Sequence, residues 1–283
     1  MTYHLTHHKN YNYFPEKVNI ITYTILSVMT PQRQFNDADT ISWAAYNAAI
    51  RRAARAGHMK IVKLLLADPY VDPSDIIPWA AYHGHLEVVK LLLNDSRVDP
   101  SDRDNAAIRN AAEKGHLEVV KLLLNDSRVD PSDKNNDAIH WAAYHGHLEV
   151  VKLLLNDSRV DPSNPSGNYH NTAIRWAAEK GHFEIVKILL TDSRVDPSDV
   201  DNEAIRYAAE AGRLEVVKIL LADSRVDPSD KDNEAIRIVA NRGYRGYRDV
   251  KKLLLTDPRV YSSYNQNKRT EYIKLNILML MIM

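Results

Sequence analysis

The chain of 283 residues carries 37 Lys and Arg against 37 Asp and Glu, and it has no cysteine. This length predicts two domains or one elongated array rather than a single compact core. The balanced charge gives no reason to expect binding to nucleic acid or to an anionic membrane, and the lack of cysteine excludes disulfides, thiol nucleophiles and Cys-ligated zinc.

The N-terminal segment carries no targeting pattern. It lacks the basic, apolar and small-residue regions of a secretory signal, and no segment reaches the ~18 apolar residues that a membrane-spanning helix needs. We therefore expect no membrane span and an intracellular, cytoplasmic location. Residues 1–38 match nothing further along the chain, which predicts an irregular N-terminal extension or cap. The segment "DTISWAAYN" from Asp39 resembles half a unit of the repeat that follows.

From residue 39 to residue 260 the chain repeats itself. The stretch "HGHLEVVKLLLNDSRVDPS" begins at His83 and again, letter for letter, at His145. Shorter versions recur with a glycine about every 31 residues, from Gly57 to Gly212. A fixed period of this length is the signature of a stacked solenoid. We count about seven full units, with partial units at the ends.

Each unit contains two helical patterns. In "AAIRNAAEK", Ile108, Ala111 and Ala112 share one helix face, and Gly115 then ends the helix because glycine accepts a positive φ. In "HLEVVKLLLND", an apolar stripe predicts a second helix with one buried side. The stripe consists of Leu117, Val120, Leu123 and Leu124.

The segment "NDSRVDPSDKNN" should link one unit to the next. Asn125 suits a left-handed conformation at the end of the second helix, and Pro131 favours an extended backbone before it. This predicts an extended, hairpin-like loop. Arg97, Arg128, Arg159, Arg194 and Arg225 each stand two residues before an Asp. Stacking predicts an exposed ladder of weak Arg–Asp pairs, so replacing Arg128 should hardly change the Tm.

These residues resemble a known family. The segment "AIRWAAEKGHFEIVKILL" from Ala173 is similar to the ankyrin repeat T-P-L-H-x-A-A-x-x-G-H-x-x-V-V-x-x-L-L, and the resemblance covers roughly residues 40–260. It implies an all-α solenoid of stacked helix-turn-helix units with hairpin-like loops. Most units are shorter than the family's 33 residues, and A-I-R or A-I-H replaces T-P-L-H. Short units ending in "DSRVDPSD" look similar to arrays encoded by large DNA viruses of amoebae.

Two units and the C-terminus are irregular. Near Asp75 a loop is truncated, so we expect Asp75 to cap a helix that has Pro78 in its first turn. Around residues 165–171 extra residues predict a longer loop. Residues 261–283 end in "YIKLNILMLMIM", which predicts a partial C-terminal unit with an apolar capping helix.

The sequence offers no set of residues for catalysis or for metal binding. The pairs His83/His85 and His145/His147 suggest zinc, but His85, His116, His147 and His182 fill one repeated position, so we expect them to cap or pack. Phosphate-binding and nucleophile motifs are absent, and an array of similar units builds a surface rather than a pocket of unlike residues. We expect no enzyme, no metal and no cofactor.

A few positions differ from unit to unit. They are the residue before each Ala-Ala pair and the two residues before each glycine. In the ankyrin family these positions lie on the concave, protein-binding face, so the resemblance implies a candidate binding set. This set is Trp79, Tyr82, His83, Asn110, Glu113, Lys114, Trp141, Tyr144, His145, Trp176, Glu179, Lys180 and Tyr207.

For the tryptophans, packing between neighbouring units is an equal alternative. We expect a monomeric, non-catalytic module that binds a protein partner through the concave helix face and the hairpin tips. The alternative function is an adaptor whose terminal segments link a target to other machinery, such as a ubiquitin ligase.

Overall fold

The computed structural model describes residues 43–69, 71–164, 170–240 and 245–282, with only the backbone for 43–44, 245–246 and 271–282. In these ranges the chain forms fifteen helices and no strand. The expected N-terminal extension and most of the longer loop near residue 165 lie outside the described residues. The helices are α2 (Trp43–Arg55), α3 (Met59–Leu66), α4 (Ile77–Tyr82), α5 (Leu86–Leu93), α6 (Asp102–Glu113), α7 (Leu117–Leu124), α8 (Asp133–His145), α9 (Leu148–Leu155), α10 (Thr172–Lys180), α11 (Phe183–Thr191), α12 (Asp199–Glu210), α13 (Leu214–Leu221), α14 (Asp230–Ala240), α15 (Arg245–Leu254) and α16 (Pro258–Ile282).

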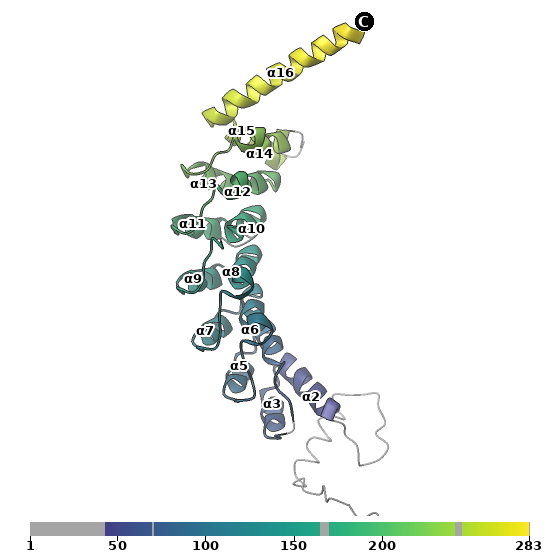
Figure 1. The fold of residues 1–283 in the computed structure, drawn as a ribbon, viewed down its shortest axis with the longest axis vertical. Coiled ribbons are helices and arrows are strands. Elements are labelled where there is room, and N and C mark those ends of the chain that lie inside the picture. The colour runs from purple at the N-terminus through teal and green to yellow at the C-terminus, as the bar shows by residue number, and fades with distance from the viewer. Residues whose placement is uncertain (1–42, 70, 165–169, 241–244, 283) are drawn as a thin grey trace, which may run out of the picture.

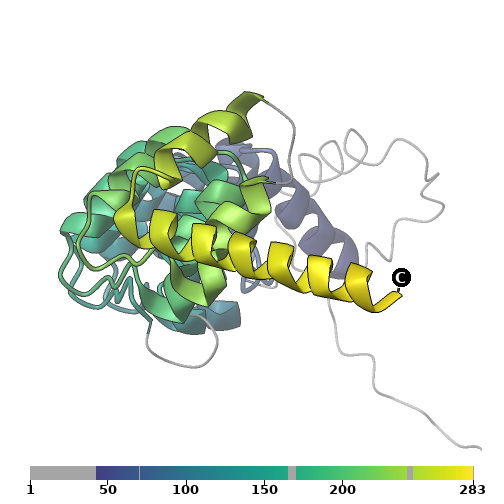
Figure 2. The same ribbon diagram turned by 90° about the horizontal axis from the view of Figure 1, so that it is seen from above.

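The helices α2 to α15 stack as pairs along one axis (Figure 1). The even-numbered helices α4 to α14 pack in one row, each against the next, and the odd-numbered helices form a second row. Seen from above, the units overlap one behind another (Figure 2). The stack is gently curved, with the even-numbered row on its inner side (Figure 1). The predicted all-α solenoid is therefore confirmed.

The buried residues repeat with the unit. Ile108, Ala111 and Ala112 on α6 are fully buried, as expected, and the alanines let neighbouring helices approach closely. On α7 the fully buried residues are Val120 and Leu123, with Val119 almost as well covered. Leu117 and Leu124, which we expected to complete the buried stripe, are only half-buried at the edge of the core.

The connection between units differs from the expected extended hairpin. After the buried Pro131 the backbone turns through Lys134, Asn135 and Asn136, whose φ values of 50°, 59° and 61° form a left-handed turn at the start of α8. The left-handed conformation expected at Asn125 is wrong, since its φ is −78°. Left-handed residues cost roughly 1–2 kcal/mol each unless side chains compensate.

A buried asparagine at the end of such a turn provides that compensation. Asn105, which ends the equivalent turn in α6, is an example. Asn105 accepts a hydrogen bond from the backbone N–H of Asp130 at 2.8 Å and donates one from Nδ2 to Asp133 at 2.9 Å. Both partners belong to the next unit. Asn171 and Asn202 make the same pair of bonds. These asparagines link successive loops without the backbone ladder of a hairpin.

The arginine of each loop also reaches across units. Arg128 forms a two-point ion pair with Asp126, at 2.9 and 2.6 Å, and donates to the carbonyl oxygens of Val98 at 3.1 Å and Leu93 at 3.2 Å in the preceding unit. Arg128 is exposed, as predicted, but its partners in the preceding unit are carbonyl oxygens and not the Asp residues of a charge ladder. The Arg pairs with the Asp two residues before it, and the hydrogen bonds from Arg128 lower the pKa of Asp126. Arg159, Arg194 and Arg225 repeat this arrangement.

The repeated histidine makes a third link. The Nε2 atom of His116 donates to the carbonyl oxygen of Tyr82 at 2.9 Å, and its ring covers Gly84. A Cβ atom on Gly84 would lie 2.5 Å from Nδ1 of His116, and its φ of +73° also requires glycine. His85, His147 and His182 make equivalent bonds. The histidines pack as expected, but none caps its helix through its side chain.

At the N-terminal end, two expectations need correction. Trp43 does not begin a separate half unit, because α2 runs unbroken from Trp43 to Arg55. Pro78 lies in the first turn of α4 as predicted, but Ile76, not Asp75, is the N-cap residue. Asp75 instead pairs with Arg51 at 3.0 Å and with Arg103 at 3.2 Å.

At the C-terminal end, α16 begins at Pro258 and crosses the expected boundary at residue 260. Val260 and Tyr264 are buried where α16 packs against α14, whereas residues 265–270 are exposed. The rest of the helix points away from the stack (Figure 1).

Candidate partner-binding face

The candidate residues lie along the inner row of helices. Trp79, Asn110, Trp141, Trp176 and Tyr207 occupy one position on α4, α6, α8, α10 and α12, each half-buried. His83 and His145 are exposed, and the other candidates are half-buried. None of the thirteen is part of the core, so all can contribute to a surface, which we call the inner face.

The tryptophan rings of α8 and α10 form contacts between neighbouring units. Trp141 and Tyr144 of α8 both contact Trp176 of α10, with ring centroids 5.2 and 5.4 Å apart. Trp141 and Tyr144 lie 5.7 Å apart, edge to face. Pairs of this kind are worth about 0.5–1.5 kcal/mol beyond area burial. The rings therefore stabilise the stack and still expose part of their surface.

The N-terminal part of the inner face is built differently. Asn110 separates Trp79 from the cluster around Trp141, and its Nδ2 atom donates to the carbonyl oxygen of Pro78 at 3.2 Å. Trp79 is covered by the guanidinium of Arg55, which lies 4.1 Å from the ring centroid. The sequence reasoning missed Arg55, although it fills the position two residues before Gly57.

Each lysine of the candidate set lies over a tyrosine of the preceding unit. Lys114 Nζ is 4.7 Å from the ring centroid of Tyr82, and Lys180 Nζ is 4.4 Å from that of Tyr144. Lys114 also bonds Glu113 at 2.7 Å. The bond to the glutamate is the main reason that the pKa of Lys114 is raised, so this lysine keeps its charge beside the aromatic ring.

Tyr207 stands apart from the other aromatic residues of the set. The hydrogen bond to Glu203 and partial burial raise its pKa, so its phenol stays neutral. Deeper in the inner face, Arg175 pairs with Glu203, and Arg206 pairs with Glu234. These ion pairs join α10, α12 and α14 beneath the exposed residues.

His140 interrupts this row of ion pairs, and the sequence reasoning gave it no role. It fills the position of Arg109 and Arg175, and Thr172 stands where the next unit would supply an acid. The side chain is fully buried, and Nε2 has no hydrogen-bond partner. Burial first, and then the charge of Arg175, lower the pKa of His140 to about 4. The sequence signal for this interruption was the segment A-I-H in one unit where others have A-I-R.

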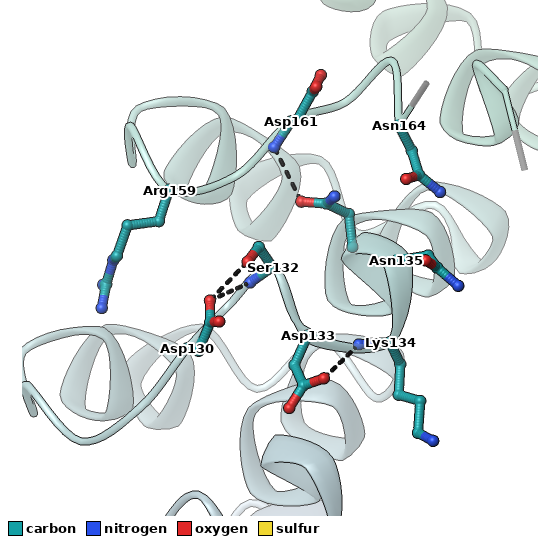
Figure 3. Close-up of a pocket in the computed structure, with 9 residues that line it drawn as sticks. Asp130, Ser132, Asp133, Lys134, Asn135, Arg159, Asp161 and Asn164 are labelled. Atoms are coloured by element: carbon teal, nitrogen blue, oxygen red, sulfur yellow. Dashed lines mark hydrogen bonds between the residues drawn. The ribbon is translucent and has the colours of Figure 1, made fainter. Parts of the chain in front are cut away.

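The described residues contain no group of three His, Cys, Asp or Glu side chains able to hold a metal ion. A polar recess on the loop edge, with no aromatic residue in its lining, is lined by Asp130, Asp133 and Asp161 among others (Figure 3). Asp130 accepts from the backbone and hydroxyl of Ser132, and Asp133 accepts from the backbone of Lys134. These bonds hold the loops, which gives both carboxylates a structural role.

A family model described as ankyrin repeats (3 copies) matches residues 50–135, 77–165, 108–201 and 140–232. These overlapping matches cover more than half of the chain, which therefore belongs to the ankyrin-repeat family. Members of this family are generally protein–protein interaction modules and are typically non-catalytic. No curated protein matches the chain. No helix among the described residues has both the length and the apolar character needed to span a membrane.

Proposed function

We propose that this chain is a non-catalytic, monomeric module that binds a protein partner through the inner face and the adjoining loop tips. The main support is the distribution of differences between units. The Asn, Arg and His links and the apolar core repeat along the stack, whereas the half-exposed residues of the inner face vary. Large aromatic residues with a polar end, such as Trp141 and Tyr144, are the types that dominate binding energy at interfaces.

A double variant on one unit tests this function. Tyr144→Ala with His145→Ala removes exposed surface from α8, and Glu149→Ala with Lys152→Ala on α9 is the matched control from the outer row of the same unit. We expect affinity capture followed by mass spectrometry to lose a protein partner with the first variant only. Equal capture by both variants, with both folded by circular dichroism, would contradict binding through the inner face.

The adaptor is a second candidate, and the position of α16 favours it. This helix runs beyond the stack, where it can reach other machinery while the inner face holds a target (Figure 1). A chain ending at Thr270 keeps the buried Val260 and Tyr264. We expect this shorter chain to capture the target but to lose a second component, such as a ubiquitin ligase. Retention of every component would argue against the adaptor.

A further inference from the structure

The inner face contains one group of residues twice. Tyr82 and His83 precede the glycine of one unit, and Glu113 and Lys114 precede the glycine of the next. The same residue types return two units later, and the neighbouring units on either side break the pattern. The second copy consists of Tyr144, His145, Glu179 and Lys180.

The two copies also share their geometry. The Tyr82 and His83 rings are 5.1 Å apart at 80°, and the Tyr144 and His145 rings are 4.9 Å apart at 79°. In each copy the histidine also stacks, at 24° or 25°, on the repeated histidine two residues later. A lysine covers each tyrosine, and each lysine bonds its own glutamate at 2.7 Å. The insertion after residue 164 has not altered this arrangement.

Each copy offers two aromatic rings, packed edge to face, beside hydrogen-bond donors. Burial lowers the pKa of His83 and of His145, so both exposed imidazoles are neutral at pH 7 and present one N–H and one acceptor nitrogen. The ammonium beside each tyrosine has three N–H groups, of which the glutamate uses one and the tyrosine hydroxyl a second. An apolar side chain fits the rings, and a carboxylate fits the remaining donors.

The charge of the neighbouring helix favours the same occupant. Helix α2, which packs against α4 of the first copy, carries Arg51, Arg52 and Arg55 and no acidic residue, and of these Arg51 pairs with Asp75. The Arg55 guanidinium extends the first copy over Trp79. An acidic segment of a partner would therefore be attracted to this end of the inner face.

We propose that the two copies are corresponding subsites for one extended partner polypeptide, although Trp176 contacts the tyrosine of the second copy only. The partner carries two elements, each with an apolar side chain next to a carboxylate. The apolar group lies on the Tyr and His rings, and the carboxylate pairs with Lys114 or Lys180. This inference rests on the proposed function, because it takes the inner face as the binding surface. Joining two such elements in one chain makes the second contact intramolecular, which typically raises affinity by about 10²–10⁴-fold.

The probe is a library of random peptides displayed on phage and selected on the immobilised full-length protein. Selected sequences should share an apolar–acidic element. A synthetic peptide with one element should bind two per chain by isothermal titration calorimetry, and a peptide with two linked elements should bind one per chain at least about tenfold more tightly. Tyr82→Ala and Tyr144→Ala should each reduce the stoichiometry of the single-element peptide from two to one.

Tyr261→Ala is the matched control, because Tyr261 is an exposed tyrosine on α16 and lies outside the inner face. The exposed His83→Ala and His145→Ala replace the tyrosine variants if either of those fails to fold. If one peptide binds per chain, and only one of Tyr82→Ala and Tyr144→Ala abolishes its binding, the pair of subsites is overturned and the proposed function is left intact. Binding that no inner-face variant affects, or no selected peptide, would overturn both.

Discussion

The loop edge and the inner face belong to the same units, yet one is almost constant along the stack and the other is not. On the loop edge, Asn105, Arg128 and their equivalents bond atoms of an adjacent unit. At such positions every substitution would weaken a junction. On the inner face, His145 is exposed and stands where the units on either side have Lys114 and Lys180, so this position can differ at little cost. The comparison teaches that repetition marks what holds the stack together, and variation marks what is free to bind.

The largest effect should come from the core that both regions share. Leu123 is fully buried on α7, so Leu123→Ala should lower the free energy of unfolding by about 2–5 kcal/mol. Leu64 on α3 is 48% exposed, and Leu64→Ala is the control with a change below about 0.5 kcal/mol. Urea unfolding measures both. Equal changes would show that the repeated leucines do not form one buried core.

His140 should make stability depend on pH. An unfolded histidine titrates near 6.5, whereas His140 in the folded chain has a pKa of about 4. Between these values the unfolded chain binds the proton and the folded chain does not. Stability is therefore fully present above about pH 6.5 and falls, by roughly 3 kcal/mol in total, as the pH approaches 4.

Urea unfolding between pH 7 and pH 4 tests this against His140→Gln, which should lose that part of the pH dependence. The exposed His58→Gln should keep it. If the wild type and His140→Gln lose stability in parallel, the buried imidazole is not the cause.

The asparagine link offers a matched pair of neighbours. Asn105→Ala removes both bonds to the next unit and should cost about 1–3 kcal/mol in thermal or urea unfolding. Asn135 has a similar left-handed backbone but an exposed side chain, so Asn135→Ala should cost less. A cost at Asn135 equal to that at Asn105 would mean that the backbone conformation, rather than the link, sets the effect.

The smallest effect should come from an ion pair outside both regions. Glu149 and Lys152 lie one turn apart on α9, with their charged groups 2.7 Å apart and about half or more of each side chain exposed. A double-mutant cycle should give a coupling of about 0.2–0.5 kcal/mol, and less at high salt. A coupling above 1 kcal/mol would place this pair among the structural links.

Much of the fold could be predicted from local spacing. The positions of Ile108 and Leu123 in a helical period identified buried faces, and the glycine period identified the stack. The candidate face was harder, because spacing showed that Trp141 varies but not that it touches Trp176. The roles of Arg55 and His140 depend on neighbours from other units, which no single unit reveals.

By itself the sequence determined the helix pairs and their order, since helix periodicity and a glycine stop act within one unit. Only the tertiary structure decided what joins the units. Arg128 had an Asp on either side in the sequence, and it pairs with Asp126 because that geometry also brings its guanidinium to two carbonyl oxygens of the preceding unit. From the sequence, Asn105 could be assigned only to a turn, because its hydrogen-bond partners lie in the next unit. The physical reason is that these bonds exist only after neighbouring units have packed.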